Sequence, residues 1–237
     1  MRIIDRIQSV LKTDSAQVKK TFDAAMNASC TEFEVNNWLT SEFVLGQLVP
    51  VVGTHPFPLN ELMLMSAAVC RLKPPQIFEW GTHIGKSARI FYECANHFGI
   101  QTEIHSIDLP DDVHHVEHPH EERGKLVRGL PSVQLHQGDG LNMALSAWRS
   151  GGHKPHPLFF VDGDHSYESV LRELGGITRE IPDANVLLHD TFYQSSGSAY
   201  NVGPHLAIED VLRLNPARYR RIDSGFGLPG MTLLYQL

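Results

Sequence analysis

Apolar and polar positions follow a helical period over the first part of the chain. Near the N-terminus, apolar residues recur at steps of three and four, which places them on one face of a helix. These residues are Ile3, Ile4, Ile7, Val10 and Leu11. A second helix is expected after Asp14 or Ser15, which are good capping residues, and a third over most of residues 32–48. Residues 50–58 hold three prolines and a glycine, which predicts a connector. Residues 59–72 then form a strongly apolar helix.

From residue 76 onward, short apolar runs alternate with stretches of helical period. The runs predict seven strands, over residues 76–80, 103–107, 132–136, 157–161, 184–188, 218–222 and 231–236. Helices are expected over residues 86–98, 118–129, 141–149, 166–179 and 204–214. Strands that alternate with helices form βαβ units, so the pattern predicts a mainly parallel sheet. The segment SGFGLPG before the last strand is too short for a helical crossover, so the last two strands are expected to pair antiparallel.

The composition restricts the class of protein without identifying it. Hydrophobic residues make up 42% of the 237 residues, which argues against disorder. The formal net charge of −7 argues against a generic nucleic-acid binder, which needs a basic face. Three cysteines without CxxC spacing indicate free thiols in a reducing compartment. Because we find no signal peptide and no apolar run of about 18 residues, we expect a soluble, cytoplasmic protein.

The segment after the first expected strand reads EWGTHIGKS, residues 79–87. It is one residue short of the phosphate-binding GxxxxGK[ST] loop, and His83 stands where the dinucleotide GxGxxG fingerprint needs a glycine. An acid followed by GxxxG suits a cationic ligand without phosphate. Glu79 would face the positive charge, while Gly81 and Gly85 let the backbone come close. A plain strand-to-helix turn, with glycine for packing, is the alternative.

Acidic residues also stand at or just past the ends of the next four strands, at Asp108, Asp139, Asp162 and Asp190. Ligands of open α/β sheets bind beyond the carboxyl ends of the strands, so these acids predict one acidic edge. An acid in the place of Asp108 can accept both hydroxyls of a ribose. Asp139, between two glycines, can reach an adenine amino group. For each of these two acids, a helix cap or a turn is the alternative.

Together these motifs resemble those of the class I S-adenosylmethionine-dependent methyltransferases. FEWGTHIGKSA resembles their first motif, IHSIDL their ribose-binding motif and LHQGDG their adenine-side motif. FFVDGDHSYESV and VLLHDTF are more specific, and resemble small-molecule O-methyltransferases with a divalent metal, of the catechol, macrolide-sugar and cephalosporin-biosynthesis types. The resemblance implies an α/β, Rossmann-like, seven-stranded and mostly parallel sheet with an antiparallel C-terminal hairpin and helices on both faces. The catalytic domain would span residues 58–237, after an N-terminal helical extension over residues 1–57.

The resemblance also implies a role for each matching residue. The cofactor S-adenosyl-L-methionine would be held by Glu79, Gly81, Thr82, Gly85 and Ser87 at its methionine end, by Asp108 at the ribose, and by Gly138 and Asp139 beside the adenine. Asp162 and Asp190 match the acidic metal ligands. His189 stands where the family often has an acid or an amide, and can itself be a ligand. His165 matches the general base of the sugar-methylating relatives.

These residues have a coherent chemistry of their own. Methyl transfer to an alcohol needs an in-line approach of the oxygen to the methyl group and loss of the hydroxyl proton. A divalent cation with oxygen ligands lowers the pKa of the hydroxyl, and His165 can take the proton. Asp162, Asp190 and Asp164 offer oxygen ligands that suit Mg²⁺ more than Zn²⁺. Asp162 and His165 are therefore the expected catalytic residues. The alternatives are a capping histidine, and aspartates that contact the cofactor or serve the structure.

Two segments beside this edge are expected to shape the acceptor site. Residues 108–122 are interpreted as a solvated loop over the cofactor cleft, with a lid or a transition-metal site as alternatives. The segment holds His114, His115, His118 and His120. In the loop over residues 192–204, Phe192, Tyr193 and Tyr200 either stack on an acceptor or pack on the body. The expected partners are a small-molecule acceptor and a second copy of the chain through the N-terminal helices, with no nucleic acid and no membrane.

Three functions remain open on these observations. The leading hypothesis is transfer of the cofactor methyl group to the hydroxyl of a small molecule, assisted by Mg²⁺ or another divalent cation. The second is a metal-dependent hydrolase or oxygenase that uses the DGDH and HD sequences. The third is a non-catalytic relative that binds a ligand or partner.

Overall fold

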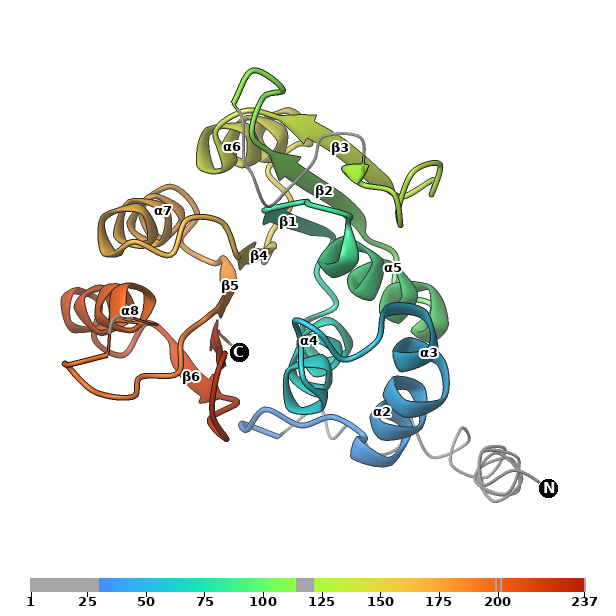
Figure 1. Cartoon of the computed structure of the whole chain (residues 1–237), viewed down its shortest axis with the longest axis horizontal. Helices are drawn as coiled ribbons and strands as arrows, with labels where there is room; N and C mark the ends of the chain where they lie inside the picture. Colours follow the sequence, from blue (N-terminus) through green and yellow to red (C-terminus); the bar gives the residue numbers. More distant parts are fainter. Residues whose placement is uncertain (1–29, 114–121, 199, 201, 237) are drawn as a thin grey trace.

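A computed structural model describes residues 30–113, 122–198, 200 and 202–236 of the chain. The first two expected helices and the histidines at positions 114–120 lie outside these described residues. Seven strands form one sheet (Figure 1). They are β1 (Gln76–Trp80), β2 (Glu103–Asp108), β3 (Val133–Gln137), β4 (Leu158–Val161), β5 (Asn185–His189), β6 (Arg220–Asp223) and β7 (Met231–Tyr235).

The strand order is β3-β2-β1-β4-β5-β7-β6. The first five strands in this order pair in parallel, and β7 pairs antiparallel with both β5 and β6. The predicted α/β class, the mostly parallel sheet and the antiparallel C-terminal pair are therefore confirmed. Every residue of β1, β4 and β5 is buried, as expected for parallel strands covered on both faces.

Helices cover both faces of the sheet (Figure 1). They are α2 (Asn37–Phe43), α3 (Val49–Val52), α4 (Leu59–Leu72), α5 (Lys86–Phe98), α6 (Gly140–Ser150), α7 (Tyr167–Glu180) and α8 (Val202–Leu214), with a π-helical turn over Val44–Leu48. One hydrophobic core lies between the sheet and α2 to α5, and the other between the sheet and α6 to α8. Among the described residues, we find no helix with both the length and the apolar character needed to cross a membrane.

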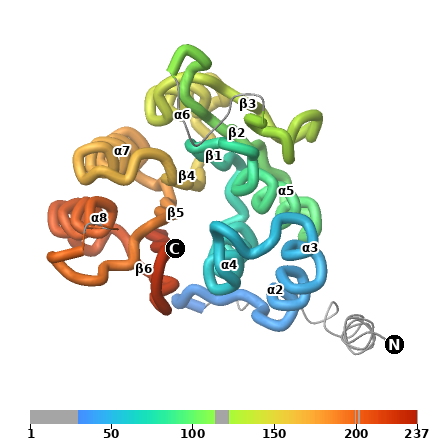
Figure 2. Tube along the Cα trace, in the orientation of Figure 1, coloured from blue at the N-terminus to red at the C-terminus, as the bar shows by residue number. Residues whose placement is uncertain are grey.

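The N-terminal segment packs into the first of these cores. Phe43, Leu48 and Phe57 are buried in the same cluster as the apolar residues of α4 and α5. Figure 2 shows residues 30–37 beside the β6–β7 hairpin, which lies far from these residues in sequence. The rings of Phe33 and Tyr235 meet edge-on at 5.0 Å. The domain boundary at residue 57 stays a prediction.

Two sequence predictions of secondary structure were wrong. The described part of the expected helix over residues 118–129 forms turns. Its backbone bonds partly to the turn after β1, through Gly124 N–H to the His83 oxygen and Leu126 N–H to the Ile84 oxygen. Gly124 also has a φ of +65°, outside helical values. The connector expected over residues 50–58 starts too early, because residues 50–52 belong to helix α3. Pro50 is tolerated there since it stands in the first turn, where a missing N–H is harmless.

Candidate active site

The carboxyl ends of β1, β2, β4 and β5 meet at one edge of the sheet, where the predicted acids stand. The turn after β1 is tied to the neighbouring strand, because Gly81 N–H donates to the carbonyl oxygen of Ile107 at 3.0 Å. The loop after β3 is tied to β2 in the same way, since Gly138 N–H donates to the Asp108 carbonyl oxygen at 2.8 Å. The sequence-predicted residues therefore share one continuous edge.

The turn after β1 requires glycine at its first position. Gly81 has a φ of +90°, and a Cβ there would overlap the backbone oxygen of Asp162 after β4. Gly85 has a φ of +85° and precedes α5, and a Cβ there would lie 2.8 Å from the side chain of Val127. These two glycines let three loops come together at the edge. Their contact with a cofactor stays a prediction.

Glu79 lies beneath this turn and is completely buried. Its two carboxylate oxygens accept hydrogen bonds from the hydroxyls of Ser87 and Ser106. Thr82 Oγ1 lies 2.7 Å from Ser106 Oγ, which joins it to the same network. Burial raises the pKa of Glu79 to about 7, against the two serine hydrogen bonds that lower it. Glu79 is thus an acid whose charge is sensitive to pH and to any cation near the turn.

Asp108 stands at the end of β2. It contacts both the turn after β1 and Arg123, which lies beyond the loop that follows β2. Its Oδ2 accepts the N–H of His83 at 3.1 Å and lies 3.2 Å from Arg123 Nε. Its Oδ1 accepts the N–H of Leu109 at 2.8 Å. A carboxylate offers about four acceptor positions, so these contacts leave room for a ligand hydroxyl.

Asp139 caps helix α6 by accepting the N–H of Asn142 at 2.9 Å, the alternative that its sequence left open. Its second oxygen accepts a hydrogen bond from Arg172 of α7 at 2.8 Å. The adjacent Gly138 has a φ of +146°. Both residues border the end of β3, and their contact with adenine stays a prediction.

A second cluster stands at the ends of β4 and β5. His189 is 5% exposed, its Nδ1 lies 2.9 Å from Asp162 Oδ1, and its Nε2 lies 3.1 Å from Oε2 of Glu61 in α4. The ring of Phe57 packs edge-on against the imidazole at 4.9 Å. Burial works against a charged ring, but the carboxylates of Asp162, Glu61 and Asp190 outweigh it and raise the pKa of His189 to about 10.

Asp190 joins this cluster to the expected base. Its Oδ2 lies 3.2 Å from His165 Nε2, and its Oδ1 accepts a hydrogen bond from the Tyr200 hydroxyl at 2.8 Å. The His165 side chain is 43% exposed and therefore accessible to a ligand. Asp190 has a φ of +55°, a conformation that Asp adopts more readily than most residues. The structure thus brings the expected base and the expected metal ligands together.

Asp162, His189 and Asp190 each offer one ligand atom, and these atoms lie within 4.8 Å of one another. That spacing and the mixed nitrogen and oxygen donors fit a divalent cation. Asp164, a further candidate, instead accepts hydrogen bonds from the backbone N–H and the hydroxyl of Ser166.

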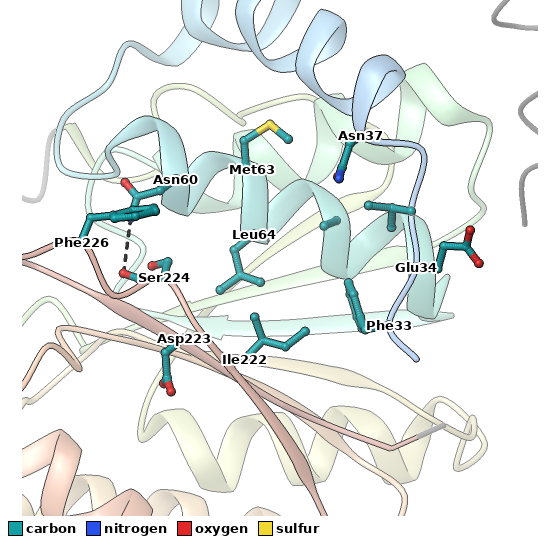
Figure 3. Close-up of a pocket in the computed structure, with 12 residues that line it drawn as sticks. Phe33, Glu34, Asn37, Asn60, Met63, Leu64, Ile222, Asp223, Ser224 and Phe226 are labelled. Atoms are coloured by element: carbon teal, nitrogen blue, oxygen red, sulfur yellow. Dashed lines mark hydrogen bonds between the residues drawn. The ribbon is translucent and has the colours of Figure 1, made fainter. Parts of the chain in front are cut away.

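Two hollows flank the turn between β6 and β7 at this edge. The first, of about 480 Å³, lies between α4, residues 33–37 and the hairpin. In Figure 3 its apolar side chains face one another across the hollow, and Asn60 donates to the Ser224 carbonyl oxygen at 3.3 Å. The second, of about 270 Å³, is lined by Phe192, Tyr193 and His205 among others.

Sequence reasoning missed three contributors to the site. Glu61 looked like an ordinary first-turn acid of an apolar helix, and Ser106 like an interior strand residue. Tyr200 was expected to stack or pack, whereas its hydroxyl reaches Asp190. The one available signal was an acid at position 61 before an otherwise apolar run. Nothing in the sequence pairs that acid with His189, which lies 128 residues away.

Residues 78–191 match the model of a protein family described as a methyltransferase domain. This segment, just under half of the chain, is similar to a methyltransferase domain. The match begins within β1 and ends just past β5, so it contains every site residue predicted from the sequence. No curated protein matches the chain in sequence.

Solved structures share the fold of this chain. One is an O-methyltransferase from Bacillus cereus in complex with S-adenosylhomocysteine, with 13% identity and a TM-score of 0.54, and the match covers 95% of this chain and 100% of that one. Another is a TDP-rhamnose 3′-O-methyltransferase of calicheamicin biosynthesis, with 16% identity and a TM-score of 0.52, covering 94% and 93%. At these identities the likeness concerns the fold.

Proposed function

We propose that this protein transfers the methyl group of S-adenosyl-L-methionine to a hydroxyl group of a small molecule, with assistance from a divalent cation. The observation that carries the proposal is the His165–Asp190 pair at 3.2 Å, beside Asp162 and the Gly81 turn. A base, candidate metal ligands and the turn of the family's first motif stand within one edge of the sheet. The family match supports the methyl transfer, and the relatives named above support a hydroxyl acceptor.

The turn after β1 would hold the methionine end of the cofactor, with Glu79, Gly81, Thr82, Gly85 and Ser87 around it. Asp108 would accept the ribose hydroxyls, and Gly138 and Asp139 would border the adenine. Bound S-adenosyl-L-methionine would supply an electrophilic methyl group on a sulfonium. The net charge of this edge favours such a cation, because Glu79, Asp108 and Asp162 all lie near the turn.

His165 would act as the general base. Asp190 faces Nε2, which favours a proton on that nitrogen and leaves Nδ1 to accept the proton of the acceptor hydroxyl. The acceptor oxygen would then bond to the methyl carbon, while the electron pair of the broken C–S bond stays on sulfur. A cation held by Asp162, His189 and Asp190 would lower the pKa of the hydroxyl.

The aromatic loop after β5 supports a small-molecule acceptor. Tyr193 stacks on His205 with ring centroids 4.4 Å apart, and both line the smaller hollow beside Thr191. Tyr200 is fixed at its hydroxyl by Asp190, so its ring borders the same edge. This loop offers flat apolar surfaces next to the proposed base.

The test is an assay of S-adenosylhomocysteine formation with S-adenosyl-L-methionine, and with catechol and a nucleotide-linked deoxysugar as acceptors. We expect turnover in the full chain and a loss of roughly 10²- to 10⁴-fold in kcat in His165→Asn, because the base is removed. His156→Asn is the matched control, since His156 precedes β4 at the opposite edge and its φ of +52° suits asparagine. Equal turnover in His165→Asn and wild type would exclude His165 as the base.

A further inference from the structure

Helix α4 brings a carboxylate into the site from outside the matched family segment. Glu61 has no exposed surface, and its Oε1 accepts the backbone N–H of Gly230 at 2.8 Å. Its Oε2 lies 3.1 Å from Nε2 of His189. A backbone N–H can only donate, so the carboxylate is held as an acceptor between two fixed partners. The bond at Oε1 fixes the carboxylate in place, so its second oxygen stays directed at the imidazole nitrogen.

This contact determines which nitrogen of His189 faces the aspartates. Glu61 occupies the Nε2 side of the ring, so Nδ1 is the nitrogen that faces the two aspartates, and a cation bound there would replace the proton that Nδ1 shares with Asp162. Nδ1 lies 2.9 Å from Asp162 Oδ1 and 3.7 Å from Asp190 Oδ2. In metalloproteins, a histidine that donates one N–H to a carboxylate binds the metal through its other nitrogen, in an orientation fixed by that bond.

The donor set then decides between kinds of cation. Mg²⁺ prefers oxygen ligands and retains several waters. Imidazole nitrogen favours later transition metals such as Co²⁺ and Zn²⁺. Because the described cluster holds one nitrogen and two carboxylate oxygens, it departs from the all-oxygen set that the acids alone would predict.

We propose that Asp162, His189 and Asp190 bind a divalent transition-metal ion in preference to Mg²⁺, with Glu61 as the positioning residue that turns Nδ1 of His189 toward that ion. The inference rests on the proposed function for its expectation that a cation binds at this edge. Phe57 contributes by packing against the imidazole ring, which limits its rotation.

The test is calorimetric titration of the metal-stripped full chain with CoCl₂, ZnCl₂ and MgCl₂, together with the visible absorption spectrum of the Co²⁺ form. We expect one site per chain and Co²⁺ binding about 100-fold or more tighter than Mg²⁺. Glu61→Gln should weaken Co²⁺ binding by about 10- to 100-fold and alter the Co²⁺ spectrum. Glu93→Gln is the matched control, since Glu93 pairs with Arg89 on α5 and should leave Co²⁺ affinity unchanged.

His189→Asp is a second variant, and its result stays informative even if Glu61→Gln does not fold. It makes the donor set all oxygen, so the preference for Co²⁺ over Mg²⁺ should fall to about tenfold or less. Equal affinity of the wild type for Co²⁺ and Mg²⁺, no binding of either ion, or an unchanged Co²⁺ affinity in a folded Glu61→Gln each overturns the inference.

Binding of S-adenosylhomocysteine, measured on the same samples, separates this inference from the proposed function. A chain that binds S-adenosylhomocysteine but shows no preference for Co²⁺ overturns the metal inference alone. A chain that prefers Co²⁺ but does not bind S-adenosylhomocysteine overturns the proposed methyl transfer and leaves the metal preference standing.

Discussion

At the scale of single residues, Glu79 shows most clearly how burial changes chemistry. Its carboxylate has no exposed surface and accepts hydrogen bonds from two serine hydroxyls. Burial raises its pKa from 4.5 to about 7. The serines stabilise the ionised form, but they do not replace all of the lost water. A cation bound at the turn would favour the ionised form further.

The raised pKa of Glu79 predicts a pH-dependent stability. Below pH 4.5 both folded and unfolded chains carry the proton, so the residue contributes nothing to the pH dependence. Between pH 4.5 and 7 the unfolded chain loses the proton first, so the folded state becomes less stable relative to a Glu79→Gln variant. The variant should therefore gain up to about 3 kcal/mol over wild type across this range. Urea unfolding at several pH values measures it, and a pH-independent difference would contradict the account.

His189 and Asp190 illustrate what adjacent residues do at the end of a strand. His189 belongs to β5 and turns inward to Glu61 and Asp162, whereas Asp190 contacts His165 and Tyr200. The two consecutive side chains thus contact different residues, although His189 Nδ1 and Asp190 Oδ2 lie 3.7 Å apart in the same cluster. The left-handed backbone of Asp190 lets the chain turn at this point.

At the scale of elements, the turn between β1 and α5 is the most constrained segment of the site. Its first glycine touches the loop after β4, and Gly85 lies against residues 124–127. Because three loops meet there, a change in this turn should affect the whole edge. The same contacts explain why a helix over residues 118–129 does not form in its described part.

Gly81→Ala should destabilise the protein by roughly 3 kcal/mol or more, because a φ of +90° is strained for alanine and its Cβ would overlap the Asp162 carbonyl oxygen. Gly175→Ala, inside α7 with no atom within 4 Å of the added Cβ, is the matched control. It should stabilise by about 0.5–1 kcal/mol. Urea unfolding of both variants checks the prediction, which fails if the two substitutions have similar effects.

At the scale of the whole molecule, the sheet was readily predicted from the sequence. Seven short apolar runs gave seven strands, each within two residues of its expected ends. Parallel strands that are buried on both faces have a strong local pattern, and the short β6–β7 connection excludes a helical crossover. The sequence predictions failed where tertiary contacts override the local helical period. At Gly124, for example, the N–H donates to the carbonyl oxygen of His83 rather than to a residue of the same helix.

The candidate site was predictable in part for the same reason. Acids at strand ends fall on one edge by topology alone, so Asp108, Asp162 and Asp190 could be grouped without coordinates. Their partners could not be predicted, because Glu61 and Ser106 arrive from other elements and carry no distinguishing local pattern. One such partner, Glu61, contacts the Nε2 side of His189 and so leaves Nδ1 facing the aspartates.

Binding of S-adenosyl-L-methionine at this edge of the sheet is the step on which the proposed function depends. The decisive measurement is calorimetric titration of the full chain with S-adenosylhomocysteine, the product of methyl transfer. Asp108→Ala serves as the variant, and Asp112→Ala, an exposed acid four residues away, as its control. We expect saturable binding of one molecule per chain, lost in Asp108→Ala and kept in Asp112→Ala. No binding to the wild-type chain at millimolar S-adenosylhomocysteine would contradict it.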